Sequence, residues 1–190
     1  MEMVRKVMKQ TKSIILLFLA VLPAFSQDRQ PAGACRLETK YDHNTDTTTV
    51  HCDLLELGEG APKLAVRANA SFRGKEPDET AIFWFSLSSY KGGATRQTQP
   101  LFKEATTLFL MTESARLTIP IKDYRNDFFE LNRLLAERAR AEIGNEDLQK
   151  LLDARSLEGK WGGVEFKFSD TALASLKDFI SHQVFASHTH

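Results

Sequence analysis

Cysteine is scarce in this chain, which has only Cys35 and Cys52 among its 190 residues. Sixteen residues separate the two thiols, and this spacing excludes a CxxC redox pair. A zinc site would need two further ligands, and the only histidines near the cysteines are His43 and His51. His51 is adjacent to Cys52 in a predicted strand, so its side chain points to the opposite face. This pattern favours a structural disulfide between Cys35 and Cys52.

The motifs of common enzyme classes are also missing. The sequence has no GxSxG or SxxK nucleophile motif, and no HExxH motif, P-loop or glycine-rich dinucleotide fingerprint. Acidic residues are numerous, so some of them lie close together in the sequence by chance, and such pairs do not by themselves indicate a catalytic site. Glu146 and Asp147, for example, are explained by their place in the first turn of a predicted helix, where the helix dipole favours negative charge. We therefore expect a non-catalytic protein without a cofactor. The alternative is a small secreted hydrolase that uses paired carboxylates.

Neither sign of charge is in excess, because the chain has 25 basic and 25 acidic residues. Cleavage after residue 26 would remove four basic residues and one acidic residue, which leaves 21 against 24 and a formal charge of −3. Proteins that bind nucleic acid usually carry a surplus of basic residues that contact phosphates. We therefore do not expect nucleic acid as a partner.

The N-terminus carries the longest apolar run of the chain. Basic residues precede "SIILLFLAVLPAF" (residues 13–25), and "AFS" (residues 24–26) matches a signal-peptidase site. A membrane-spanning helix needs about 20 apolar residues, so we expect residues 1–26 to be a cleaved export signal, with an uncleaved anchor as the alternative. A short linker would follow over residues 27–34. The protein would then be periplasmic or extracellular, without stable membrane insertion, and its cysteines would meet oxidising conditions.

The two cysteines flank a predicted β-hairpin. "CRLETKY" and "DTTTVHC" are rich in residues that favour extended chain. "DHNT" between them suits a tight turn, because Asn44 tolerates positive φ and Asp42 can accept a backbone hydrogen bond. A two-residue loop of His43 and Asn44 would place the cysteines on a non-hydrogen-bonded pair, about 4.5 Å apart at Cα, which a disulfide allows. The facing pairs would be Cys35 with Cys52, Leu37 with Val50, and Tyr41 with Asp46.

The middle of the chain alternates between apolar and polar residues, as strands do. "PKLAVRANASF" (residues 62–72) predicts a half-buried strand. "TAIFWFSLSS" (residues 80–89) is apolar on both faces and predicts a central strand, with Trp84 in the core. "ATTLFLMTE" and "ARLTIPI", from residues 105 and 115, predict two further strands. Five or six strands with short links indicate an antiparallel sheet or a small β-sandwich.

A loop between these strands, "YKGGATRQTQP" (residues 90–100), has the composition of a flexible segment. Loops carry function more often than strands do. We therefore predict a contact loop formed by Tyr90, Gly92, Gly93 and Arg96, with an ordinary solvated loop as the alternative.

The segment from residue 126 to residue 143 fits both a helix and a strand. Asn126 suits a helix cap, whereas residues 139–143 alternate as in a strand. We expect a short helix or turn first and a strand near the end. The apolar face of the helix would consist of Phe128, Leu131, Leu134, Leu135 and Ala139.

Two helices and a hairpin are predicted after this segment. "NEDLQKLLDA" (residues 145–154) predicts a helix capped by Asn145. Residues 156–169 predict a hairpin that bends at Gly162 and Gly163. "SDTALASLKDFISHQV" (residues 169–184) predicts an amphipathic helix capped by Ser169 or Asp170.

The sequence thus predicts a single α+β domain over residues 35–184, mainly an antiparallel sheet or small sandwich with two C-terminal helices flanking a hairpin. Residues 185–190 would form a flexible tail, in which His188 and His190 are weak candidates for metal ligands. The expected function is that of an exported, non-catalytic binding or structural module, whose partner is an unknown protein or another component of the cell envelope or extracellular space.

Overall fold

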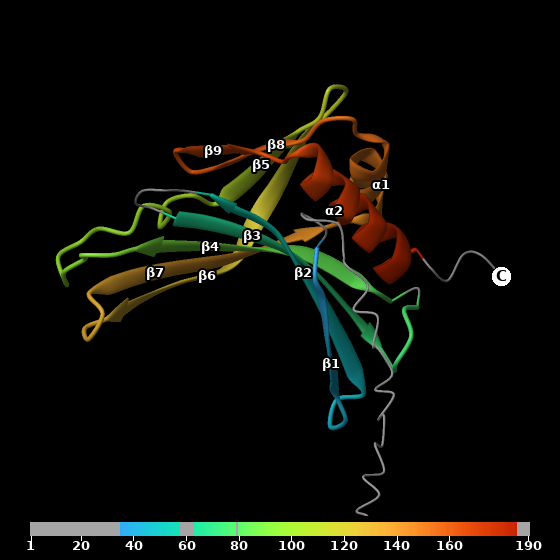
Figure 1. The fold of residues 1–190 in the computed structure, drawn as a ribbon, viewed down its shortest axis with the longest axis horizontal. Helices are drawn as coiled ribbons and strands as arrows, with labels where there is room; N and C mark the ends of the chain where they lie inside the picture. Colours follow the sequence, from blue (N-terminus) through green and yellow to red (C-terminus); the bar gives the residue numbers. More distant parts are fainter. Residues whose placement is uncertain (1–34, 58–62, 79, 186–190) are drawn as a thin grey trace, which may run out of the picture.

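The computed structural model describes residues 35–57, 63–78 and 80–185 (Figure 1). The expected signal (residues 1–26) and linker (residues 27–34), together with His188 and His190, lie outside the described residues. The described residues form nine strands and two helices. Their bounds are β1 (Leu37–Asp42), β2 (Thr47–Leu57), β3 (Lys63–Arg73), β4 (Ile82–Lys91), β5 (Thr107–Met111), β6 (Arg116–Phe129), β7 (Leu134–Ile143), α1 (Asn145–Asp153), β8 (Glu158–Trp161), β9 (Val164–Lys167) and α2 (Asp170–Gln183).

The strands form one antiparallel sheet in the order β1-β2-β3-β4-β7-β6-β5-β8-β9. Strand β6 joins the two parts of this sheet, because its first half pairs with β5 and its second half with β7. Within the half that pairs with β7, Asp123 and Tyr124 lie opposite the single residue Ala139, and Asp123 has a φ of 52°. Such a β-bulge bends a strand. As a result β5, β8 and β9 form a second layer across from β3 and β4 (Figure 1).

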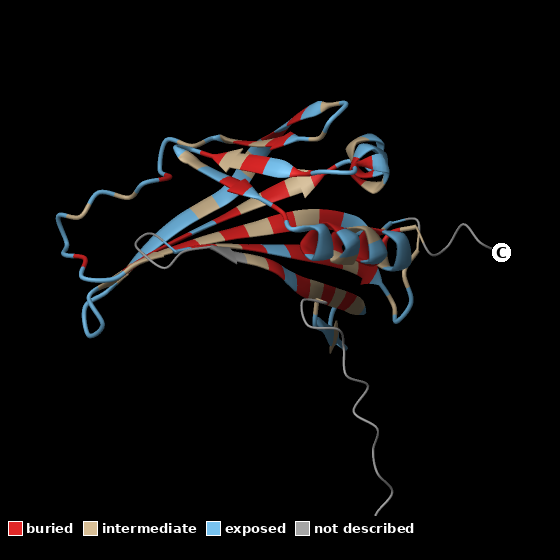
Figure 2. Ribbon diagram, turned by 45° about the horizontal axis from the view of Figure 1, so that its top comes forward, coloured by how far each residue is buried: buried red, intermediate tan, exposed pale blue. Residues whose placement is uncertain are grey.

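The hydrophobic core lies between these two layers. Phe83 and Phe85 point inward from β4, and their ring centroids lie 6.0 Å from Phe179 of α2 and 6.4 Å from Phe168, respectively. Helix α2 packs against β2 and β3, and α1 packs against α2. Figure 2 shows the alternation of buried and more exposed residues along the strands. Burial of each phenylalanine side chain stabilises the folded chain by about 1.5–3 kcal/mol. This alternation therefore determines which face of the sheet turns inward.

The fold class expected from the sequence is confirmed, with two C-terminal helices that flank the hairpin β8–β9. The hairpin turns at Gly162, which has a φ of 56°. Ser169 caps α2, because its hydroxyl oxygen accepts a hydrogen bond of 3.1 Å from the backbone N–H of Ala172. Helix α1 forms where it was expected, but its N-cap is Gly144, and no side-chain hydrogen bond caps the helix there. The capping role assigned to Asn145 is therefore wrong.

The helix or turn expected at the start of residues 126–143 is replaced by a long strand. Strand β6 continues to Phe129, residues 130–133 form a turn, and β7 follows. Asn126 lies opposite Glu137 within the β6–β7 ladder and caps no helix. Leu131 stands at the tip of the hairpin, so the helical spacing of the apolar residues arose from two strands and the turn between them. The strand expected near the end of this segment is confirmed.

The disulfide between Cys35 and Cys52 is confirmed, with 5.4 Å between their Cα atoms, but the expected register is wrong. Strand β1 is shifted by two residues, because the loop contains four residues (43–46) and not two. Asp42 accepts the backbone N–H of Asn44 at 2.9 Å, as expected, yet the residue with positive φ is Asp46, at 50°. The observed facing pairs are Leu37 with Cys52, Thr39 with Val50, and Tyr41 with Thr48.

Strand β4 is central, as predicted, but Trp84 does not belong to the core. The inward positions of β4 are occupied by Phe83 and Phe85, so the residue between them faces outward. Trp84 is half-buried there, and the Arg140 guanidinium carbon lies 4.1 Å from its ring centroid. A cation–π contact of this kind stabilises an aromatic side chain on a polar face.

Candidate functional site

The predicted contact loop lies beside the tip of the β6–β7 hairpin. Tyr90 stands near the end of β4, opposite Ala136 of β7. Beyond it the β4–β5 loop crosses to the tip, where the backbone N–H of Ala94 donates to the carbonyl oxygen of Arg133 at 2.8 Å. Gly93 has a φ of 68°, which glycine adopts without strain. We call the β4–β5 loop (residues 92–106) and the tip (residues 128–133) together the loop end.

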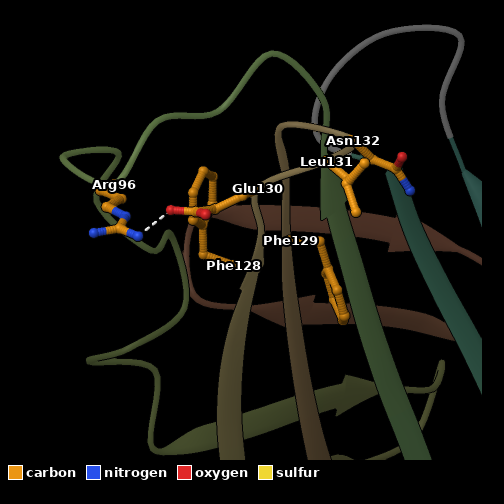
Figure 3. Close-up of a pocket in the computed structure, with 6 residues that line it drawn as sticks. All are labelled: Arg96, Phe128, Phe129, Glu130, Leu131 and Asn132. Atoms are coloured by element: carbon orange, nitrogen blue, oxygen red, sulfur yellow. Dashed lines mark hydrogen bonds and ion pairs between the residues drawn. The ribbon is translucent and has the colours of Figure 1, made fainter.

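An ion pair joins the two segments of the loop end. The guanidinium of Arg96 donates a hydrogen bond to the carboxylate of Glu130 (Figure 3). Phe128 lies on the same side of the hairpin as this pair, whereas Phe129 and Leu131 point to the other side (Figure 3). The structure therefore brings Arg96, a predicted contact residue, next to apolar residues that the sequence had assigned to a helix.

The tip exposes large apolar side chains. Leu131 is 100% exposed and Phe129 is 44% exposed. A cavity of about 580 Å³ opens between the tip and the loop. Leucine and phenylalanine are among the residues most often buried in proteins, and contiguous exposed apolar surface marks interaction sites. The lining residues, drawn in Figure 3, are Arg96, Phe128, Phe129, Glu130, Leu131 and Asn132.

The β4–β5 loop is anchored to the sheet by a buried carboxylate. Glu137 of β7 is only 1% exposed. Its two oxygens accept hydrogen bonds from the backbone N–H groups of Leu101 (3.0 Å) and Phe102 (2.8 Å) and from the hydroxyl of Tyr124 (2.7 Å). Burial and the hydrogen bond to Glu137 together raise the pKa of Tyr124 to about 12. Three donors thus compensate for the burial of this charged group.

A second anchor of the loop is aromatic. The ring of Phe102 is buried and stacks on Trp161 of β8, with 3.9 Å between the ring centroids. Aromatic pairs of this kind stabilise a fold by about 0.5–1.5 kcal/mol beyond their buried area. The β4–β5 loop is therefore fastened at residues 101 and 102, and the ordered loop carries Arg96 to the tip.

One surface cleft brings together two carboxylates, as the hydrolase alternative would require. This cleft, of about 260 Å³, is lined by both Glu158 and Glu165. Glu158 lies 3.3 Å from Lys167, and Glu165 accepts a hydrogen bond of 2.8 Å from Lys160. The hydrogen bond from Lys160 lowers the pKa of Glu165, whereas a catalytic acid of this type needs a raised pKa. The geometry of this cleft therefore favours surface ion pairs over acid–base chemistry.

The described part of the chain contains no group of three or more histidine, cysteine or acidic side chains placed to hold a metal ion. No helix within residues 35–57, 63–78 and 80–185 combines the length and the apolar character needed to cross a membrane. Comparison with known proteins finds no matching family model, no matching curated protein and no matching solved structure.

Three residues that form or anchor the loop end escaped the sequence analysis. Leu131 was assigned to the apolar face of a helix, and neither Phe129 nor Glu137 was singled out. The available signal was the four-residue stretch "ELNR" (residues 130–133) between two alternating segments, in which Asn132 is a typical turn residue. Glu137 carried no local signal, because its partners Leu101 and Phe102 are more than 30 residues away in the sequence.

Proposed function

We propose that this chain is an exported, non-catalytic binding module that contacts a protein of the cell envelope or extracellular space through the loop end. The observation that carries the proposal is the complete exposure of Leu131 at an apolar tip whose neighbouring loop is anchored by Glu137. Burial of a leucine or phenylalanine side chain in a partner would contribute about 1.5–3 kcal/mol. An anchored loop also loses little conformational freedom on binding, which favours affinity.

Export is supported by two independent features. The Cys35–Cys52 disulfide is typical of proteins that fold in oxidising compartments. Residues 1–26 have the charge pattern, apolar run and cleavage motif of an export signal. If the proposal is right, the protein isolated from its host cells begins at Gln27 and contains an intact disulfide, which intact-mass spectrometry under non-reducing conditions measures. Recovery of the uncleaved chain with free thiols from the cytosol would refute export.

The contact surface can be tested by site-specific photo-crosslinking in the host. A photoreactive amino acid is placed at position 131 or, as a control, at position 82. Ile82 is 50% exposed and is a matched apolar control at the opposite end of β4. We expect the photoreactive residue at position 131 to crosslink to a discrete partner and the one at position 82 to give no crosslinked product.

Binding of the purified partner, measured by calorimetry, then gives the affinity. Leu131→Ser is expected to weaken binding about tenfold or more, since about 1.4 kcal/mol corresponds to a factor of ten, whereas Ile82→Ser leaves the affinity unchanged. Equal crosslinking at both positions, or equal affinity of the two serine variants, would contradict a contact through the tip.

A further inference from the structure

A second hollow lies on the outer face of the sheet, away from α2. It has a volume of about 290 Å³ and spans β3, β4 and β7, with Asp53 of β2 at its border. Its floor consists of small side chains, because Ala65, Ser86 and Ser88 occupy adjacent outward positions of two paired strands. We call it the outer-face hollow. Its volume is near the lower end of the range for small-molecule sites.

The strand register surrounds this floor with longer side chains. Ser88 lies between Ala65 of β3 and Arg138 of β7, so a guanidinium stands on one side of it. Ser86 lies opposite Arg67 of β3. Tyr90, two residues beyond Ser88, closes the hollow toward the loop end. The register therefore places two arginines, from different strands, around a shallow floor.

Hydrogen-bond donors predominate in the outer-face hollow. The Nε atom of Arg67 donates to Asp53 at 2.5 Å, which leaves its terminal nitrogen atoms for other acceptors. Arg138 lies 3.7 Å from Asp127, too far for a hydrogen bond. The hydroxyl oxygen of Ser86 already accepts from Asn69 at 3.0 Å, so its hydrogen is free to donate.

The charge on this face also favours an anion. The cations exceed the anions at the outward positions of the neighbouring strands, although the chain from residue 27 onward has a formal charge of −3. Ligands with the opposite charge are concentrated at such a surface. The outward positions of β2, β3, β7 and the part of β6 that pairs with β7 carry the cations Lys63, Arg67, Arg73, Lys122, Arg125, Arg138 and Arg140 and the anions Asp53, Glu56, Asp127 and Glu142.

We propose that the outer-face hollow binds a small hydroxylated molecule that carries one oxyanion group, a carboxylate or a phosphate. Arg67 and Arg138 hold the oxyanion from opposite sides, since guanidinium groups bind both chemistries through paired N–H donors. Ser86 and Ser88 donate hydrogen bonds from the floor. The proposal goes beyond the loop-end contact and is independent of it, because Leu131 does not line this hollow.

The test is a titration of the oxidised full chain, labelled with ¹⁵N, followed by amide chemical shifts at constant ionic strength. The probes are glucuronate and glucose 6-phosphate, with glucose as the neutral control. We expect saturable shifts at Ser86, Ser88 and Arg138 with at least one of the two anions, and none with glucose. The anion that binds more tightly identifies the oxyanion as carboxylate or phosphate.

Variants separate a built site from general attraction of anions. Arg67→Ala and Arg138→Ala are each expected to weaken binding about tenfold, the factor that loss of about 1.4 kcal/mol produces. Arg73→Ala is the matched control, because Arg73 is on the same strand, outside the hollow, and contacts Asp46 at 3.6 Å. Ser88→Leu fills the floor without changing charge and should abolish the saturable shifts.

Three results would overturn the proposal. The first is the absence of saturable shifts with either anion up to about 50 mM, which corresponds to a binding free energy weaker than about 2 kcal/mol. The second is an equal response to glucose. The third is an equal loss of affinity in the Arg73→Ala and Arg67→Ala variants, because that result indicates only non-specific attraction.

Discussion

Replacement of Glu137 by glutamine tests whether one buried carboxylate fixes the β4–β5 loop to the sheet. Glu137 accepts the backbone N–H of Phe102 and the hydroxyl of Tyr124 at Oε1, and the backbone N–H of Leu101 at Oε2. Glutamine has the same shape but replaces one of these oxygens by an NH₂ group. If the amide oxygen stays at the position of Oε1, the NH₂ group meets the N–H of Leu101, so that two donors face each other.

The expected loss of stability follows from these two donors that face each other. A hydrogen bond to a charged group contributes about 1.5–3 kcal/mol, and a buried donor left without a partner costs about 1–3 kcal/mol. The loss is partly offset, because glutamine no longer buries a charge. We therefore expect Glu137→Gln to lower the free energy of unfolding by about 2–3 kcal/mol.

Urea unfolding of the oxidised chain at pH 7, followed by tryptophan fluorescence, measures this change. Hydrogen exchange should also become faster at the amides of Leu101 and Phe102. The matched control is Glu142→Gln on the same strand, whose carboxylate is on the outer face and pairs with Lys122 and Arg140. Exposed pairs contribute about 0–1 kcal/mol, so the control should be nearly neutral. An unfolding free energy of Glu137→Gln within about 0.5 kcal/mol of the parent chain, with unchanged exchange, would refute the reasoning.

Two further predictions concern the second layer and the bulge. Gly159→Ala should lower the free energy of unfolding, measured in urea, by about 1–3 kcal/mol, because a Cβ atom there would lie 2.2 Å from Cε2 of Phe166. The control is Gly163→Ala. A Cβ atom at Gly163 would meet nothing within 4 Å, so this variant should be as stable as the parent chain. The pKa of Tyr124 is raised from 10.0 to about 12 in the folded chain, so its contribution to stability is complete below pH 10 and is lost as the pH rises toward 12. After a discount for its partial exposure, this amounts to about 1 kcal/mol. The difference in unfolding free energy between the parent chain and Tyr124→Phe should therefore shrink between pH 10 and about pH 12, and a constant difference would count against this role.

Elements whose signals are local were predictable from the sequence. Strand β3 follows the period of two that the sequence displays, because one of its faces is buried, and the continuous apolar run of residues 80–89 predicted the central strand β4. Helix α2 begins after Ser169, whose side chain supplies the expected cap. The β8–β9 hairpin turns at Gly162, where a positive φ favours glycine. In each case the residues that determine the element are its immediate neighbours in the sequence.

Elements that depend on distant contacts were not predictable. The β1–β2 register follows from a four-residue loop in which the hydroxyl of Tyr41 donates to Asp46 at 2.7 Å, and composition does not specify that length. The bulge at Asp123 and Tyr124 is defined by pairing with β7, which the sequence does not reveal. Trp84 was assigned to the core because its neighbours are apolar, although the pleat turns it outward beside Arg140.

Of the two segments that form the candidate site, only the β4–β5 loop was predictable from the sequence. The loop residues Gly93 and Arg96 were selected because loops carry function more often than strands do, and they lie at the loop end. The other side depends on the β4–β7 pairing, which brings the hairpin tip to the same end of the sheet as this loop. Leu131 and Glu137 acquire their roles from that pairing, and neither role has a signature in the neighbouring sequence.

Glu137, which anchors the loop end, and Leu131, at its tip, have different roles: the first stabilises the fold and the second is available for contact with a partner. Glu137 is buried and satisfies three donors, so the fold depends on it. Leu131 is completely exposed, and removal of its side chain therefore takes no buried apolar area from the folded chain. Leu131→Ser should leave the free energy of unfolding unchanged within about 0.5 kcal/mol. A loss of partner binding in that variant would therefore report a lost contact at the tip and not a damaged fold, whereas the same loss in Glu137→Gln would report displacement of the loop.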